Sequence, residues 1–219
     1  IEKIAIKDVK MRTFITQDVG RNEMVQHVYD ITYGTVKKDV DTLVVIDDSI
    51  VRGTTLKESI IRMLSRLSPK RIVVISSAPQ IRYPDCYGID MSKLGEFIAF
   101  NAAIELLKEE GKLDFLKELH EKCKDLHRNN QLHAENVVKQ VYKSFNPEQL
   151  SKKIAELITP ADVQVPVDVI YQTIESLHEA CPTNTGDWYF TGNYPTPGGN
   201  RVVNKAFMNY MDGKNVRGY

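Results

Sequence analysis

Residues 43–55 read Leu-Val-Val-Ile-Asp-Asp-Ser-Ile-Val-Arg-Gly-Thr-Thr, and this stretch decides the fold. Its first four residues are apolar and mostly β-branched, which is typical of a strand buried on both faces of a sheet. Asp47 and Asp48 end the apolar run, and a short loop containing Gly53 follows. We therefore predict a buried strand whose carboxyl end carries two acidic residues.

The residues after this loop predict a helix and a second strand. Apolar residues recur at helical spacing from Leu56 to Leu67, and Pro69 follows them. Residues 71–75 form another run rich in β-branched residues. A strand, a helix and a strand within about 35 residues form a βαβ unit, which implies a parallel sheet.

The rest of the chain is predicted to be mainly helical. The expected fold class is α/β, with a parallel sheet and flanking helices in a core of residues 1–111 and a helical extension in residues 112–219. The individual elements expected are a strand over 12–16, helices over 22–33, 92–110, 113–127, 134–145, 147–158 and 167–180, a short strand over 188–191, and a loop through Gly199.

Composition excludes several classes of protein. Lys and Arg together number 29, as do Asp and Glu, so the formal net charge is zero, and we expect no nucleic-acid partner. No apolar run approaches the ~20 residues that span a bilayer, so we expect no membrane segment. The odd set of Cys86, Cys123 and Cys181 suits a reducing cytoplasm. Because a patterned segment starts directly at Ile1, we expect a piece of a longer or processed protein.

The loop after the first strand has the composition of an anion site. Unpaired N–H groups at a helix start favour a phosphate, and Gly53 lets the backbone approach it closely. Ser49, Thr54 and Thr55 offer hydroxyl donors. The two carboxylates can accept hydrogen bonds from sugar hydroxyls and help to hold Mg²⁺. These groups together suit a ribose 5-phosphate, whereas a P-loop and a dinucleotide fingerprint are both absent from the sequence.

Residues 47–55 closely resemble the motif that binds 5-phosphoribosyl 1-pyrophosphate (PRPP) in type I phosphoribosyltransferases, in particular the glutamine PRPP amidotransferases. The resemblance implies a type I phosphoribosyltransferase-like sheet with flanking helices. Further similarity lies in SAPQIRYP at 77–84, YGIDM at 87–91, EFIA at 96–99, FTGNYPT at 190–196, and RTFI at 12–15, which is similar to the start of the family's flexible active-site loop.

The resemblance also implies a reaction. Ammonia released from glutamine would attack C1 of PRPP, displace pyrophosphate and give 5-phosphoribosylamine in purine synthesis. Purine nucleotides would act as inhibitors, and the protein would form a homo-oligomer. The implied catalytic residues are Asp47, Asp48 and Arg12, the implied magnesium ligands are Asp47 and Asp48, and the implied ribose and 5-phosphate site consists of Asp47, Asp48, Ser49, Ile50, Val51, Arg52, Gly53, Thr54 and Thr55.

The sequence departs from the family in the parts that serve the leaving group and the ammonia supply. No glutaminase domain with an N-terminal cysteine is present, so we expect it upstream or on a separate chain. Val25, Gln26, His27 and Val28 stand where the family has Val-Arg-x-Lys in its flexible loop, which leaves Arg12 and Arg21 to stabilise pyrophosphate. We therefore expect this chain alone to be an incomplete enzyme.

An iron–sulfur cluster is not expected. Some relatives hold a cluster through four cysteines, whereas here Gly186 and Tyr189 occupy one pair of those positions. Asp85 occupies a third position, with Cys86 shifted by one residue.

Two other functions remain open from the sequence alone. The altered flexible loop is compatible with a non-catalytic module that senses PRPP or a nucleotide. A salvage or pyrimidine phosphoribosyltransferase shares the acid pair but not the segment at 77–91. Three histidines, His120, His127 and His133, fit exposed helical faces better than a metal site.

Overall fold

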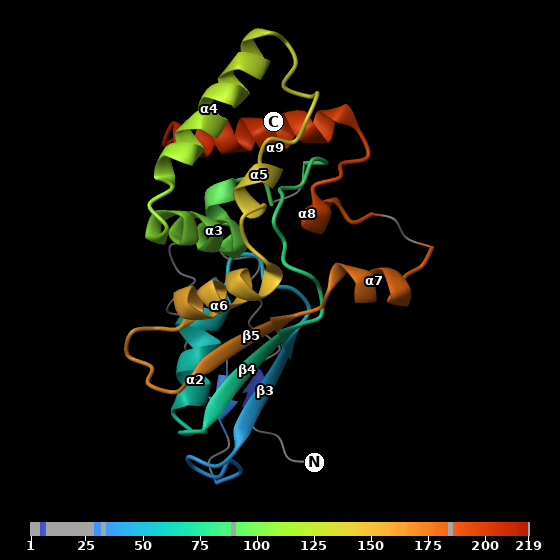
Figure 1. Ribbon diagram of the computed structural model, residues 1–219. Coiled ribbons are helices and arrows are strands. Elements are labelled where there is room, and N and C mark those ends of the chain that lie inside the picture. Colours follow the sequence, from blue (N-terminus) through green and yellow to red (C-terminus); the bar gives the residue numbers. More distant parts are fainter. Residues whose placement is uncertain (1–4, 8–28, 32–33, 89–90, 184–185, 219) are drawn as a thin grey trace.

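The computed structural model describes residues 5–7, 29–31, 34–88, 91–183 and 186–218. Its central element is a three-stranded parallel sheet with the order β3 (Thr42–Asp47), β4 (Arg71–Ser76) and β5 (Val167–Tyr171). A separate antiparallel pair consists of β1 (Ala5–Lys7) and β2 (Tyr29–Ile31). Figure 1 shows the three parallel strands at one end of the molecule and most of the helices beyond their carboxyl ends.

Helices make up most of the remaining described chain. They are η2 (Leu56–Ile60), α2 (Ile61–Ser65), η3 (Leu94–Glu96), α3 (Ile98–Glu109), α4 (Leu113–Arg128), α5 (Lys139–Tyr142), α6 (Pro147–Ile158), α7 (Ile174–Ala180), α8 (Trp188–Thr191) and α9 (Pro197–Met211). The predicted βαβ unit is confirmed, because η2 and α2 connect β3 to the parallel strand β4. Within the described residues, no helix is long and apolar enough to cross a membrane.

The two faces of the sheet differ in burial. Leu43, Ile72 and Val74 are buried on the face against which α2 and α6 pack. On the other face, Ile46, Ile75 and Ile170 lie side by side across the three strands. Ile46 is 72% exposed and Ile170 53% exposed. The prediction that the first strand is buried on both faces is therefore wrong for this structure.

The prediction of a helix over residues 167–180 is wrong. Val167–Tyr171 is the third strand of the sheet, and only Ile174–Ala180 is helical. Backbone hydrogen bonds to β4 fix this strand, with Ile72 N donating to Pro166 O at 2.9 Å and Gln172 N to Ser76 O at 3.1 Å. The sheet therefore takes a strand from beyond residue 111, where the sequence predicts helices.

The expected helix over residues 134–145 is shortened to α5 because a buried side chain takes the backbone groups that a helix would use. Asn204 of α9 accepts a hydrogen bond from Val137 N at 3.0 Å. Its amide nitrogen donates to Leu132 O at 2.9 Å and to Glu135 O at 2.7 Å. The segment therefore forms turns around Asn204 before α5 begins.

Four further expectations need correction. Residues 188–191 form a single helical turn and not a strand, and Pro197 starts α9 within the expected loop. The helix expected over 92–110 is broken at Phe97, whose backbone is extended with φ −83° and ψ 121°. Tyr29–Ile31 is a strand within the helix expected over 22–33, while the strand expected over 12–16 lies outside the described residues.

Helix α6 follows its prediction from Pro147 to Ile158. Asn146 Oδ1 accepts a hydrogen bond from Gln149 N at 2.8 Å, and Gln149 Oε1 accepts one from Asn146 N at 2.9 Å. This reciprocal capping box, with proline at the first helical position, fixes the start of the helix. The helix packs against α3 and β5, and Ile158 at its end is buried.

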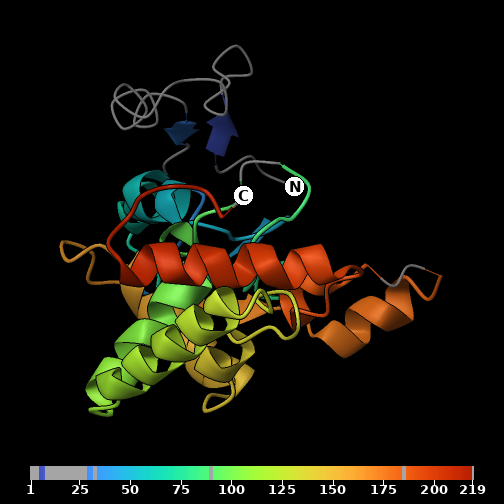
Figure 2. The same cartoon turned by 90° about the horizontal axis from the view of Figure 1, so that it is seen from above.

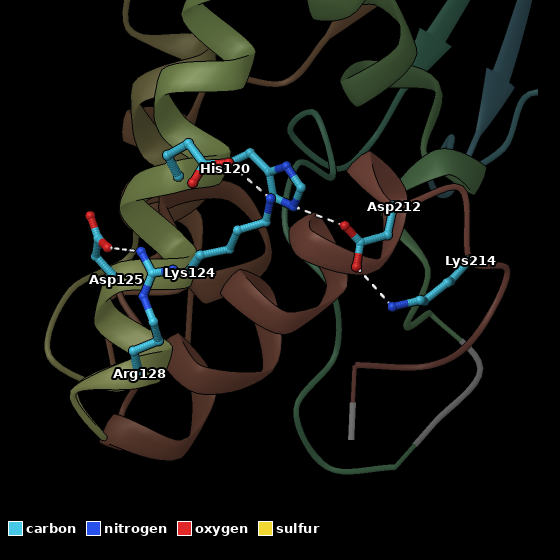
Figure 3. Close-up of polar contacts among 7 residues, drawn as sticks. His120, Lys124, Asp125, Arg128, Asp212 and Lys214 are labelled. Atoms are coloured by element: carbon cyan, nitrogen blue, oxygen red, sulfur yellow. Dashed lines mark hydrogen bonds and ion pairs between the residues drawn. The ribbon is translucent and has the colours of Figure 1, made fainter.

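Helices α4 and α9 cross in the helical layer, as Figures 1 and 2 show. His120 of α4 is buried between them, with its Nε2 3.1 Å from Asp212 Oδ1 (Figure 3). Lys214 Nζ donates to Asp212 Oδ2 at 2.9 Å, and this bond lowers the pKa of the Asp212 carboxyl. His120 thus packs between α4 and α9, and the prediction that it lies on an exposed helical face is wrong.

Candidate functional site

The candidate site lies at the carboxyl edge of the parallel sheet. Asp47 is the last residue of β3, and its carbonyl oxygen accepts a hydrogen bond from Ser77 N at 2.9 Å, just after β4. Since parallel strands end at the same edge, the carboxyl ends of β4 and β5 border the same region. Ligands of open α/β sheets bind at this edge.

The two acidic residues have different surroundings. Asp47 is partly buried, and its Oδ1 accepts a hydrogen bond from Asp48 N at 3.0 Å. Asp48 is exposed, and its Oδ1 accepts one from Ser49 N at 2.6 Å. Burial raises the pKa of the Asp47 carboxyl above its ordinary value; the Asp48 N–H opposes the rise, and the charge of Asp48 adds to it. The folded protein therefore holds an unfavourable negative charge at Asp47 that a cation or hydroxyl donor can relieve.

Side chains of the loop that follows divide into packing residues and accessible ones. Ile50 is 3% exposed, so only its backbone is able to reach a ligand. Val51 is half-buried, and its carbonyl oxygen accepts a hydrogen bond from Ile98 N at 2.8 Å. Thr54 is exposed, while Ser49 and Thr55 are half-buried. The predicted hydroxyl donors thus lie at the surface of a loop held from beneath by apolar side chains.

Gly53 lies close to the helices that pack beneath the loop. Its φ is +71°, a conformation that side chains disfavour. A Cβ atom at this position would lie 2.7 Å from Ile158 Cγ2 of α6 and 3.6 Å from Ile98 Cγ1 of α3. The sequence predicts that Gly53 lets the backbone approach a ligand. In the structure, Gly53 also lets the loop pack closely against Ile158 and Ile98.

The start of the following helix leaves backbone donors at the site. Lys57 N donates to Gly53 O at 3.0 Å, which closes the first helical turn. Thr55 has helical angles, φ −62° and ψ −39°, and its side chain makes no capping hydrogen bond. The next residues, Leu56–Ile60, form a π-helical turn, a geometry frequent at functional sites. The N–H groups of residues 53–55, which precede this turn, are suited to an anion.

Arg52 makes a contact that the sequence did not predict. Its Nε and Nη2 both donate to Glu96 Oε2, at 3.0 Å and 2.6 Å. Glu96 belongs to the segment EFIA singled out from the sequence, but no role was assigned to it. The two residues are 44 positions apart, so no local pattern links them.

The acid pair offers suitable oxygen ligands for magnesium. Two carboxylates from the protein, together with oxygens of a bound phosphate compound and water, are a common coordination set for Mg²⁺. Across residues 34–88, 91–183 and 186–218, no basic side chain forms an ion pair with Asp47 or Asp48. The described residues contain no cluster of three or more His, Cys, Asp or Glu side chains that could hold a metal ion. Arg12 and Val25–Val28 lie outside the described residues.

Two of the positions considered for an iron–sulfur cluster are joined by a hydrogen bond. Tyr189 Oη donates to Asp85 Oδ1 at 2.8 Å, and Tyr87 N donates to Asp85 Oδ2 at 2.8 Å. Asp85 is fully buried, and burial raises the pKa of Tyr189 to about 12. This contact ties the segment at 83–88 to α8.

Replacing Gly53 with alanine is expected to destabilise the protein more than the same change at Gly111. Both glycines have positive φ, +71° and +68°, so each alanine costs about 1 kcal/mol in backbone strain. A Cβ at Gly111 would have no atom of the described residues within 4 Å, whereas one at Gly53 would clash with Ile158, at a further cost of roughly 1–3 kcal/mol. Chemical denaturation of both variants measures the difference, and equal losses would contradict the packing role of Gly53.

The variant Asp47→Asn is expected to stabilise the ligand-free protein. Removing a carboxylate whose pKa is raised increases the free energy of unfolding at pH 7, by a small amount because Asp47 is only partly buried and solvent screens its charge. The gain is full above the folded-state pKa and disappears as the pH falls below the ordinary aspartate value of about 3.9. Thermal unfolding from pH 3 to 8 tests this.

Asp114→Asn is the matched control, since Lys117 lowers the pKa of that exposed carboxyl. This variant is expected to lose stability at pH 7. If Asp47→Asn also loses stability, the ionised form of Asp47 is not disfavoured in the folded protein, and the prediction is contradicted.

Comparisons with known proteins point to one group. No family model matches the chain. An amidophosphoribosyltransferase of Haemophilus influenzae is 47% identical over 72 residues, which are 33% of this chain and 14% of the relative. One of Staphylococcus epidermidis is 40% identical over 102 residues, 44% of this chain and 19% of the relative. This chain therefore spans less than a fifth of the length of either relative.

Among solved structures, the chain is similar to a glutamine PRPP amidotransferase of Bacillus subtilis, complexed with ADP and GMP, with a TM-score of 0.46 and 24% identity over 89% of this chain and 32% of that one. The resemblance to amidophosphoribosyltransferases that the motifs indicate is thus confirmed by the curated relatives for a third or more of the chain.

Proposed function

We propose that this chain carries the PRPP site of an amidophosphoribosyltransferase. In the proposed reaction, ammonia from glutamine attacks C1 of PRPP, a C–N bond forms, the bond to pyrophosphate breaks, and 5-phosphoribosylamine results. The observation that carries the proposal is the pair Asp47–Asp48 at the carboxyl end of β3, followed by a glycine-turned loop and a helix start. Sequence similarity to amidophosphoribosyltransferases supports the same conclusion.

Each part of the site has a proposed task. The loop from Ser49 to Thr55 would hold the 5-phosphate through its N–H groups and hydroxyls. Asp47 and Asp48 would accept hydrogen bonds from the ribose hydroxyls, which fixes C1 relative to the nucleophile. As the bond to pyrophosphate breaks, the ring gains positive charge, and the two nearby carboxylates would stabilise it.

Magnesium would be held beside the same carboxylates. When bound, Mg²⁺ would neutralise the charge that gathers on the pyrophosphate. Asp47 is suited to this contact because its ionised form is disfavoured in the ligand-free protein. Arg12 is proposed to act on the pyrophosphate side.

The proposed enzyme has further features beyond the PRPP site. The glutaminase domain, the homo-oligomer, inhibition by purine nucleotides and a cytoplasmic location are all proposals from the resemblance. The division of the chain into residues 1–111 and 112–219 also stays a proposal, with β5 linking both parts in one sheet.

Calorimetric titration of Mg²⁺–PRPP into the chain tests the proposal. We expect saturable binding that Asp47→Asn/Asp48→Asn weakens by at least roughly tenfold, because hydrogen bonds to charged groups are lost. The control is Asp114→Asn/Asp125→Asn, which removes two charges from exposed positions on α4. A folded wild-type chain that does not bind, or equal binding by both double variants, would contradict the proposed site.

A further inference from the structure

Arg52 lies within the proposed phosphate loop, yet its guanidinium contacts Glu96. Both Arg52 Nε and Arg52 Nη2 donate to one oxygen of that carboxylate, at 3.0 Å and 2.6 Å. Lys93 Nζ lies 3.3 Å from the other oxygen. Glu96 is thus held between two cations, at the end of the short helix η3 that precedes α3.

A second contact joins the same two segments through the backbone. Ile98 N donates to Val51 O at 2.8 Å, which the extended conformation at Phe97 allows. Residues 51–52 are therefore tied to residues 96–98 by one side-chain contact and one backbone contact. Gly53, the next residue, rests on Ile98 and Ile158.

The energetics of the ion pair favour an orienting role over a stabilising one. The side chains of Arg52 and Glu96 are 32% and 34% exposed, and pairs of this kind add little to folding stability. Two donors on one carboxylate nevertheless restrict the direction of the guanidinium and of the backbone that carries it. The consequence falls on the N–H groups of Gly53, Thr54 and Thr55, which follow directly.

We propose that Glu96 is a positioning residue for the 5-phosphate loop, acting through Arg52. Arg52 then anchors the loop to η3 and α3 and is not itself a phosphate ligand. The inference rests on the proposed function and deepens it, since it says which part of the loop recognises the phosphate. The backbone N–H groups and hydroxyls recognise it, and the arginine keeps them in place.

The sign of one effect distinguishes this proposal from simple electrostatics. If Glu96 only neutralised Arg52, then removing its negative charge would make the surroundings of the loop more positive and strengthen binding of an anion. If Glu96 positions the loop, then removing its charge loosens the loop and weakens binding. The proposal requires weaker binding.

The test is a double-mutant cycle with ribose 5-phosphate as the titrant. Glu96→Gln and Arg52→Ala are each expected to weaken binding roughly tenfold, and the double variant no more than either single one, because each substitution removes the contact between Arg52 and Glu96. Arg52→Lys, which keeps a donor for Glu96, is expected to recover part of the affinity. The control Glu105→Gln removes an equal charge from an exposed pair with Lys108 and should leave binding unchanged.

Tighter or unchanged binding by Glu96→Gln, or additive losses in the double variant, would overturn the proposal. Hydrogen exchange provides a readout that needs no ligand, with faster exchange expected across residues 49–56 in Glu96→Gln and unchanged exchange in α4. If the wild-type chain does not bind ribose 5-phosphate, the proposed function fails. Equal exchange at residues 49–56 in the wild type and the variant would then overturn the anchor as well.

Discussion

The close approach of Gly53 to Ile158 and Ile98 is the constraint on which the rest of the site depends. At this point the chain turns with a φ of +71°, and a side chain would meet Ile158 Cγ2 at 2.7 Å. The contact sets the distance of the loop from α6 and from α3. Because α6 packs on β5, the loop after the first parallel strand is also fixed relative to the last one.

This arrangement separates what holds the loop from what can meet a ligand. Ile50 and Gly53 face the core, and Arg52 is engaged with Glu96. The exposed Thr54 and the uncapped helix start remain at the surface. Burial raises the pKa of the Asp47 carboxyl, so its ionised form is disfavoured while no ligand is bound. A site with fixed hydrogen-bond donors and a carboxylate whose ionised form is disfavoured is preorganised for a charged ligand.

Local signals were sufficient for the first βαβ unit and for α6. The β-branched run before Asp47 and the Asn146–Pro147 cap are features that neighbouring residues decide. Prediction from the sequence failed where a distant partner decides. Val167–Tyr171 is a strand because it pairs in parallel with β4. Residues 132–138 form turns because the side chain of Asn204 makes hydrogen bonds with their backbone groups. The role of Glu96 could not be predicted for the same reason, since its partner Arg52 is 44 residues away in the sequence.

A crystal structure of the chain with ribose 5-phosphate tests the central claim most directly. We expect the phosphate over the N–H groups of residues 53–55, the sugar hydroxyls at Asp47 and Asp48, and Arg52 still on Glu96. A phosphate bound elsewhere would contradict the proposed site. An Arg52 side chain that leaves Glu96 to contact the phosphate would contradict its role as an anchor.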